Sequence, residues 1–129
     1  MTQWFYPRGT LRRGPWETVV DQELPGWKHT GMRVADATDA PEFHIAPDGI
    51  ERVIYVLQGT GAEVTYTLAG ADESETVEIS GRQSVFHGAV DYLYLPINTD
   101  ITIRPHTRVM VVEAIASNPK PVQLRRAAD

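Results

Sequence analysis

The residues best suited to metal chemistry in this chain are its four histidines, and their spacing does not favour a shared site. A divalent transition metal needs several nitrogen or oxygen ligands that converge in fixed geometry. His29, His44, His87 and His106 are far apart in the sequence, and no two of them lie two residues apart, the spacing that would place both on one face of a strand. The chain has no cysteine, so a thiolate site, a disulfide and a cysteine nucleophile are excluded. We therefore expect no metal and no cofactor in this chain.

Arg52 is the charged residue best placed for a specific role, because it opens an apolar run. It shares parity with Ile54 and Val56, so its side chain should point to the same side of a strand as theirs. A buried guanidinium is costly unless it is paired. Arg52 is therefore either a bidentate clamp for the carboxylate of a small ligand, or a residue that reaches water or a nearby carboxylate. We favour the second interpretation. The carboxylates considered as partners are Glu42, Asp48 and Glu51.

Three further residues complete the set of candidate ligand-binding residues: His44, His87 and Tyr94. His87 stands between Phe86 and Gly88 at the end of an expected strand, where an imidazole that lined a pocket could act as a general base. A solvent-facing histidine is the simpler interpretation, and a tyrosine within an apolar strand more often belongs to a core or an interface. No Gly-x-Ser-x-Gly motif is present, so a hydrolase triad is not supported. We predict no catalytic residue.

The elements that must position these residues are predicted to be short strands. The sequence alternates runs rich in Val, Ile, Thr and Tyr with Gly, Pro, Asn and Asp, and helical periodicity is almost absent. A turn is expected at Gly59-Thr60-Gly61. The expected strands are Thr30–Val34, Glu42–Ile45, Arg52–Leu57, Glu63–Leu68, Glu75–Ile79, Ser84–Phe86, Tyr92–Leu95, Ile101–Ile103 and Val109–Ile115. This spacing predicts an all-β protein, an antiparallel sandwich or barrel.

Three of these strands are apolar on both parities and so should need cover on both faces. They contain Val53–Leu57, Tyr92–Leu95 and Val109–Val112. The interior of a barrel covers one face. The other face is covered either by a second layer of the same domain or by another barrel, in the same polypeptide or in a second subunit. A homodimer through these strands is one prediction from this pattern.

Composition bounds the remaining possibilities. The chain has 129 residues, enough for one domain, and a net charge of −5. It shows no basic patch with interleaved aromatic residues, so we expect no nucleic-acid partner. It has no signal-like start and no apolar run of about 18 residues, so we expect no membrane and a cytoplasmic location. We expect residues 1–24 to form an N-terminal arm, 25–117 a β-barrel, and 118–129 a tail or linker, in which residues 122–124 are either a final strand or the start of another domain.

Several residue groups together resemble a known family. In order and spacing they are similar to the N-terminal half of 5-deoxy-glucuronate isomerase, a bicupin related to 4-deoxy-L-threo-5-hexosulose-uronate ketol-isomerase. The resemblance covers nearly the whole chain and implies a cupin-type β-barrel, the double-stranded β-helix of the jelly-roll class. The groups that carry it are Pro7-Arg8-Gly9-Thr10-Leu11, Gly26–Val34, Val56-Leu57-Gln58-Gly59, Gly81–Gly88 and Asp91–Pro96.

The resemblance also implies where the family's metal is held, which is in the C-terminal cupin. In the first cupin motif a metal-binding Glu lies seven residues before the Gly that corresponds to Gly59, and Arg52 stands at that position here. In the second motif Ile101 stands where the His would be. The implied role is a structural or oligomerisation half of a sugar-acid aldose–ketose isomerase of inositol catabolism, without chemistry of its own. Whether this chain is itself an enzyme stays open. The alternative is a stand-alone cupin that binds a small anion such as a sugar acid, and a partner cupin is the alternative to a homodimer.

Overall fold

The computed structural model describes residues 6–21, 23–24, 27, 29–82 and 90–126. All regular elements in these ranges are strands. The described residues therefore contain no helix long and apolar enough to cross a membrane. The all-β prediction is confirmed. The strands are β1 (Thr18–Val20), β2 (Thr30–Asp36), β3 (Phe43–Ile45), β4 (Ile50–Thr67), β5 (Glu75–Arg82), β6 (Tyr92–Leu95), β7 (Asp100–Pro105), β8 (Arg108–Ile115) and β9 (Gln123–Arg125).

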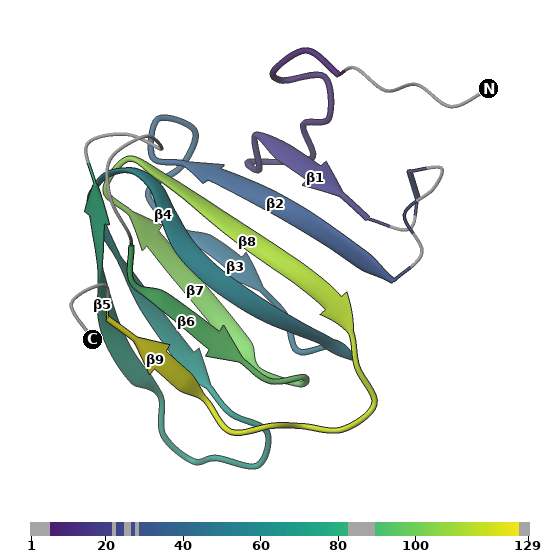
Figure 1. Cartoon of the computed structure of the whole chain (residues 1–129), viewed down its shortest axis with the longest axis vertical. Coiled ribbons are helices and arrows are strands. Elements are labelled where there is room, and N and C mark those ends of the chain that lie inside the picture. The colour runs from purple at the N-terminus through teal and green to yellow at the C-terminus, as the bar shows by residue number, and fades with distance from the viewer. Residues whose placement is uncertain (1–5, 22, 25–26, 28, 83–89, 127–129) are drawn as a thin grey trace.

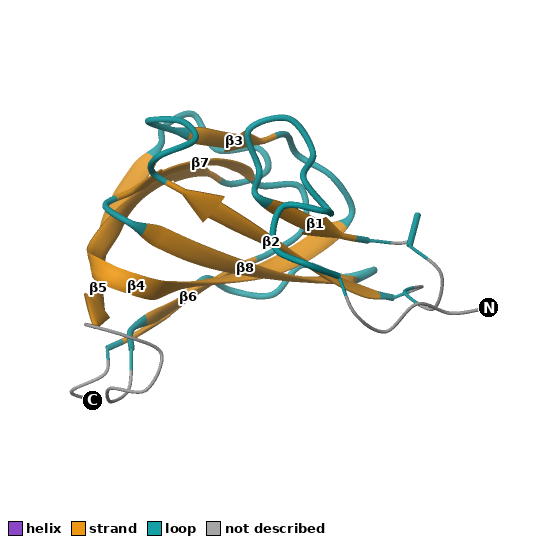
Figure 2. Ribbon diagram, turned by 90° about the horizontal axis from the view of Figure 1, so that it is seen from above, coloured by secondary structure: helices purple, strands orange, loops and turns teal. Residues whose placement is uncertain are grey.

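The strands form one antiparallel sheet that folds over itself into two layers. The front layer has the order β1-β2-β8-β4-β6-β9 (Figure 1). The back layer contains β5, the second half of β4, β7 and β3. Seen from above, β3 and β7 lie opposite β8, β4 and β6 across the interior (Figure 2). Strand β2 pairs with β8 along its whole length, from Thr30 opposite Ala114 to Asp36 opposite Arg108.

The strand β4 corrects one prediction, the turn at Gly59-Thr60-Gly61. These residues lie inside a single strand of 18 residues that pairs with β8 and β6 in its first half and with β5 and β7 in its second. The register shifts between Val56 and Gln58, and Gly59 and Gly61 have φ angles of 106° and 155°. A bulge and glycines at positive φ bend a strand without ending it. The glycines therefore carry β4 from one layer to the other.

The core lies between the two layers and is built from the inward parity of each strand. Ile54, Val56, Leu93 and Val111 of the front layer are completely buried or nearly so. Residues of the back layer with the same burial are Phe43, Val64, Ile101 and Ile103. Within the segment expected as an N-terminal arm, Trp16 is buried and packs on Phe43, with the ring centroids 4.9 Å apart, and β1 pairs with β2. Within the expected tail, residues 123–125 form the final strand β9, which pairs with β6.

The side of the front layer that faces away from the core carries two rows of apolar side chains, which we call the outer face. Directly opposed residues of paired strands share a face of a sheet, and the pairs run across β2, β8, β4 and β6. The outer face consists of Met32, Val112, Val53 and Tyr94 in one row and Val34, Met110, Tyr55 and Tyr92 in the other. The buried parity of the same strands faces β3 and β7, which lie across the interior in Figure 2, so the outer face is on the other side of the front layer. Most of its side chains are partly exposed, and Val112 is 41% exposed.

The expected strand Ser84–Phe86 lies outside the described residues.

Candidate functional site

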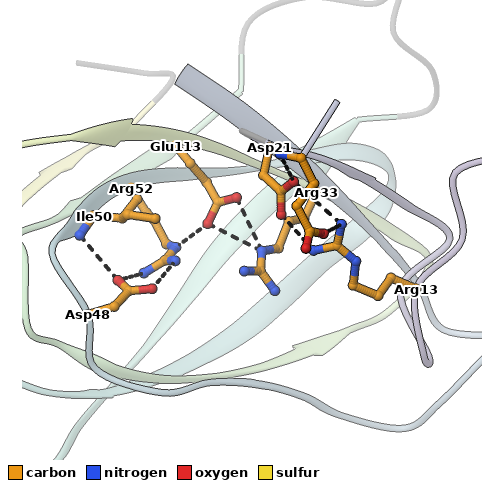
Figure 3. A network of polar contacts seen from close by, with 8 residues as sticks. Arg13, Asp21, Arg33, Asp48, Ile50, Arg52 and Glu113 are labelled. Atoms are coloured by element: carbon orange, nitrogen blue, oxygen red, sulfur yellow. Dashed lines mark hydrogen bonds and ion pairs between the residues drawn. The ribbon is translucent and has the colours of Figure 1, made fainter. Parts of the chain in front are cut away.

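Arg52 is the centre of a buried ionic network at one end of the barrel (Figure 3). Its residue is 2% exposed, and it points inward with Ile54 and Val56, as parity predicted. Its Nε donates to Glu113 Oε2 at 2.5 Å. Its two terminal nitrogens donate to the two carboxylate oxygens of Asp48 at 2.8 and 2.9 Å. Asp48 was one of the partners considered from the sequence, whereas Glu113 was not.

These contacts keep Arg52 charged inside the protein. Burial alone lowers the pKa of a guanidinium, because it disfavours the charged form. Here the hydrogen bonds and charges of Asp48 and Glu113 outweigh burial, and the pKa of Arg52 lies above its ordinary value. All three nitrogens of the guanidinium are already engaged with protein carboxylates. A ligand carboxylate could bind Arg52 bidentately only by displacing Asp48.

The network continues from Glu113 to Arg33 and ends beside a second ionic group. Arg33 Nε lies 3.2 Å from each carboxylate oxygen of Glu113, and its guanidinium carbon lies 5.2 Å from the centre of a Trp16 ring. Arg13 binds Asp21 at 2.6 Å on the far side of Arg33 (Figure 3). That hydrogen bond is the main reason why the pKa of Asp21 lies below its ordinary value.

A cavity of about 80 Å³ opens beside this network. It lies where β2 begins, β8 ends and β4 begins, next to Asp21, which directly follows β1. A cavity needs roughly 10–15 Å³ by this measure to hold one water molecule, so several waters or a small organic group fit. The polar and charged residues that line it are Asp21, His29, Thr30, Arg33 and Glu113.

A second ionic cluster joins the N-terminal segment to the other end of the front layer. Glu17, which is 2% exposed, accepts a hydrogen bond from Arg8 Nε at 2.5 Å and a short one from Arg108. Arg8 also donates to Asp36 at 3.1 Å. Burial raises the pKa of Asp36, but hydrogen bonds from Thr38 and the charges of Arg108 and Arg8 outweigh it and bring the pKa below its ordinary value. Because each carboxylate here has its cations in contact, this cluster is a structural tie for residues 8–17.

The candidate residues from the sequence do not meet at one place. Arg52 lies inside the barrel, whereas His44 projects from the exposed side of β3 and its Nε2 lies 2.6 Å from Asp100 Oδ1. Tyr94 lies on the outer face, and its hydroxyl donates to Glu51 at 2.5 Å. Burial and this hydrogen bond raise the pKa of Tyr94 to about 12. His87 lies outside the described residues.

Apolar and ionic side chains occupy the positions that correspond to the family's metal motif. Ile101, at the implied histidine position, is 1% exposed in the core of the back layer. Arg52, at the implied glutamate position, is held by Asp48 and Glu113. Among the residues that the structure describes, no three histidine or carboxylate side chains are grouped as metal ligands. The residues present at these two positions do not fit a metal.

Glu113 and Arg33 were missed by the sequence analysis, although parity could have identified them. Glu113 follows Val109 and Val111 on the inward parity of an apolar strand, and an isolated carboxylate there calls for a cation. Arg33 precedes the buried Ala35 by two residues on β2. What the sequence could not give is the register of β2, β8 and β4, which brings Arg33 and Arg52 to the same carboxylate.

Comparison with known proteins places this geometry among relatives. A sequence model of the KduI/IolB family matches residues 4–129. No match was found among curated proteins. An IolB-like protein from Salmonella typhimurium LT2 superposes with a TM-score of 0.73 at 21% identity, over 91% of this chain and 43% of that one. Hazelnut (Corylus avellana) vicilin gives a TM-score of 0.45 at 16% identity, over 75% of this chain and 25% of its own. The first superposition confirms the cupin-type fold. This chain spans less than half the length of that IolB-like protein.

Proposed function

The chain belongs to the KduI/IolB family, and on that premise we propose that it is the non-metal cupin half of a sugar-acid isomerase. In this proposal the barrel supplies packing and subunit contacts, and a partner cupin holds the metal and carries out the aldose–ketose isomerisation. The observation that carries the proposal is Arg52. The resemblance implies that the corresponding strand position in the family's other half carries a metal-binding carboxylate. In this chain that position holds Arg52, a cation hydrogen-bonded to Asp48 and Glu113.

The outer face supports the same proposal. Eight apolar or aromatic side chains lie in two rows across four paired strands, on the side of the front layer away from the core. A surface of this kind on one barrel fits a partner whose own surface is apolar, such as a second cupin barrel. The length of the IolB-like relative, of which this chain matches 43%, leaves room for such a barrel in a family member.

An isomerase assay on the purified 129-residue chain tests the proposal. We expect no turnover of 5-deoxy-glucuronate or of 4-deoxy-5-ketouronate, with or without added Zn²⁺, Mn²⁺, Fe²⁺ or Ni²⁺. Turnover that survives removal of contaminating enzymes and is abolished by a chelator would overturn it. The matched control is the chain with Arg104→Gln, which changes an exposed arginine of the back layer and should behave identically.

Binding of a small anion by the barrel itself is the second candidate function. The three nitrogens of Arg52 are engaged by protein carboxylates, so Arg52 does not favour it. The observation that does favour it is the cavity beside Arg33, a different arginine of the same network.

A further inference from the structure

The cavity beside Arg33 has the geometry of an anion site that is already built. Arg33 uses its Nε on Glu113, and its side chain is 20% exposed. Within the described part of the chain, neither of its terminal nitrogens makes a hydrogen bond. Both nitrogens also keep some exposure to solvent, since neither is among the buried side-chain nitrogens that lack a hydrogen-bond partner. The two terminal nitrogens are therefore reachable from the cavity that Arg33 lines.

The orientation of Arg33 is fixed before any ligand arrives. Both oxygens of Glu113 hold the Nε edge of the guanidinium at 3.2 Å, and the Trp16 ring lies 5.2 Å from its central carbon. Trp16 is itself held in the core against Phe43. A guanidinium held on one edge and one face presents its remaining edge as a rigid fork, which matches the two oxygens of a carboxylate. Little side-chain entropy is then lost on binding.

The charges around the cavity select a singly charged ligand. Three cations (Arg13, Arg33 and Arg52) face four carboxylates (Asp21, Glu23, Asp48 and Glu113), so the network carries one net negative charge before a ligand binds, and each further negative charge adds to it. A carboxylate adds one negative charge beside Arg33. A phosphate dianion adds two, close to Asp21 and Glu113, and like charges at short range repel. The balance favours a monocarboxylate over a phosphate.

We propose that this cavity binds the carboxylate of a small hydroxy acid, with the two terminal nitrogens of Arg33 as its clamp. Thr30 and His29 line the same cavity and offer a hydroxyl and an imidazole to the hydroxyl groups of such a ligand. The site is separate from Arg52, whose nitrogens serve Asp48 and Glu113. It does not depend on whether the barrel has a partner cupin, so the isomerase assay and the binding experiment can fail independently.

An NMR titration of the uniformly ¹⁵N-labelled chain tests this site, with D-glucuronate as the probe. We expect saturable shifts of the backbone amides of residues 29–33 and 113–115 and of the Arg33 Nε–H signal. D-glucose, which has the same ring without the carboxylate, should produce none, and phosphate should bind more weakly than glucuronate. Arg33→Lys keeps the charge but loses the fork, and it should weaken binding by roughly tenfold or more, as expected for loss of a charge-assisted hydrogen bond.

Arg104→Lys is the matched control, because it makes the same change at an exposed arginine of the back layer whose partners are Glu42 and Glu63. It should bind glucuronate as the unsubstituted chain does. Three results would each overturn the proposal: no saturable shift, shifts that glucose reproduces, or equal affinity in the Arg33→Lys and Arg104→Lys variants. The amide spectrum of each variant, recorded without ligand, shows whether it is folded, and Arg33→Gln repeats the test if Arg33→Lys is not.

Discussion

Arg52 shows how a charge is kept inside a small barrel. Its residue is 2% exposed, yet each nitrogen has a carboxylate oxygen within 2.9 Å. Breaking such a pair is costly, because the partner is left charged and buried. We expect Arg52→Met to lower the free energy of unfolding by about 3–5 kcal/mol, measured by urea denaturation.

Arg104→Met is the comparison for that measurement, since its ion pairs with Glu42 and Glu63 are largely exposed. It should cost less than about 1 kcal/mol. If Arg52→Met costs no more than Arg104→Met, the ion pairs of Arg52 do not stabilise the fold.

Tyr94 gives a residue-scale prediction about alkaline pH. Its pKa is raised from 10.0 to about 12 by burial and by its hydrogen bond to Glu51. The folded state therefore holds this proton more tightly than the unfolded chain does, and the associated stability is complete below pH 10 and is lost as pH rises toward 12. Tyr94→Phe lacks this contribution, so its stability deficit relative to the unsubstituted chain should narrow between those pH values. Urea denaturation at several pH values measures it, and a deficit that stays constant would contradict the assignment.

At the scale of the residue, the sequence predicted orientation better than partnership. Parity with Ile54 and Val56 was enough to place Arg52 inside, and Asp48, four residues away, was within local reach. Glu113 lies 61 residues from Arg52, and its approach depends on the pairing of β4 with β8. Partners distant in sequence are fixed by strand register, which no local pattern of residues encodes.

Among the elements, β4 is the strand on which the two layers depend. The β5 residue Gly81 packs against its bend: a Cβ added at Gly81 would collide with the backbone of Gly59 and Gly61. Backbone cannot move aside as a flexible side chain can. Gly81→Ala should therefore lower the free energy of unfolding by about 1–3 kcal/mol, the range for overpacking, as measured by thermal or urea denaturation.

Gly49→Ala is the control for that substitution. Gly49 is exposed, and an added Cβ there meets nothing within 4 Å. Its effect should stay within about 0.5 kcal/mol. Equal effects at the two glycines would show that the close approach of β5 to the bend in β4 is not tightly packed.

The length of β4 is also what the sequence analysis missed among the elements. Gly59-Thr60-Gly61 between two apolar runs has the composition of a turn, and composition alone does not distinguish a turn from a bulged bend within a strand. The distinction depends on whether neighbouring strands continue past the glycines. They do here, since β5 pairs with Gly59 and Gly61 and β7 begins to pair at Ala62. Most of the other strands were predicted because their runs of β-branched and aromatic residues, bounded by turn residues, are local features of the sequence.

At the scale of the whole molecule, the outer face is what calls for a partner. Val53, Tyr55, Met110 and Val112 lie on the side of the front layer that faces away from the core, and Val112 is 41% exposed. The sequence predicted this from strands that are apolar on both parities. In a solution that contains only this chain, the surface available to cover the outer face is a second copy of it, which a two-fold interface allows.

We therefore expect the purified chain to be a dimer at tens of micromolar, by sedimentation equilibrium or light scattering. Val112→Lys places a charge at the centre of the outer face, where burial in an interface would leave it unpaired. It should shift the mass to that of a monomer without changing the circular dichroism spectrum. Thr76→Lys adds the same charge to an exposed strand residue of the back layer and should leave the dimer intact.

A monomeric unsubstituted chain would argue against self-association through this face and would direct the search to a partner cupin. A dimer insensitive to Val112→Lys would place the interface elsewhere on the molecule.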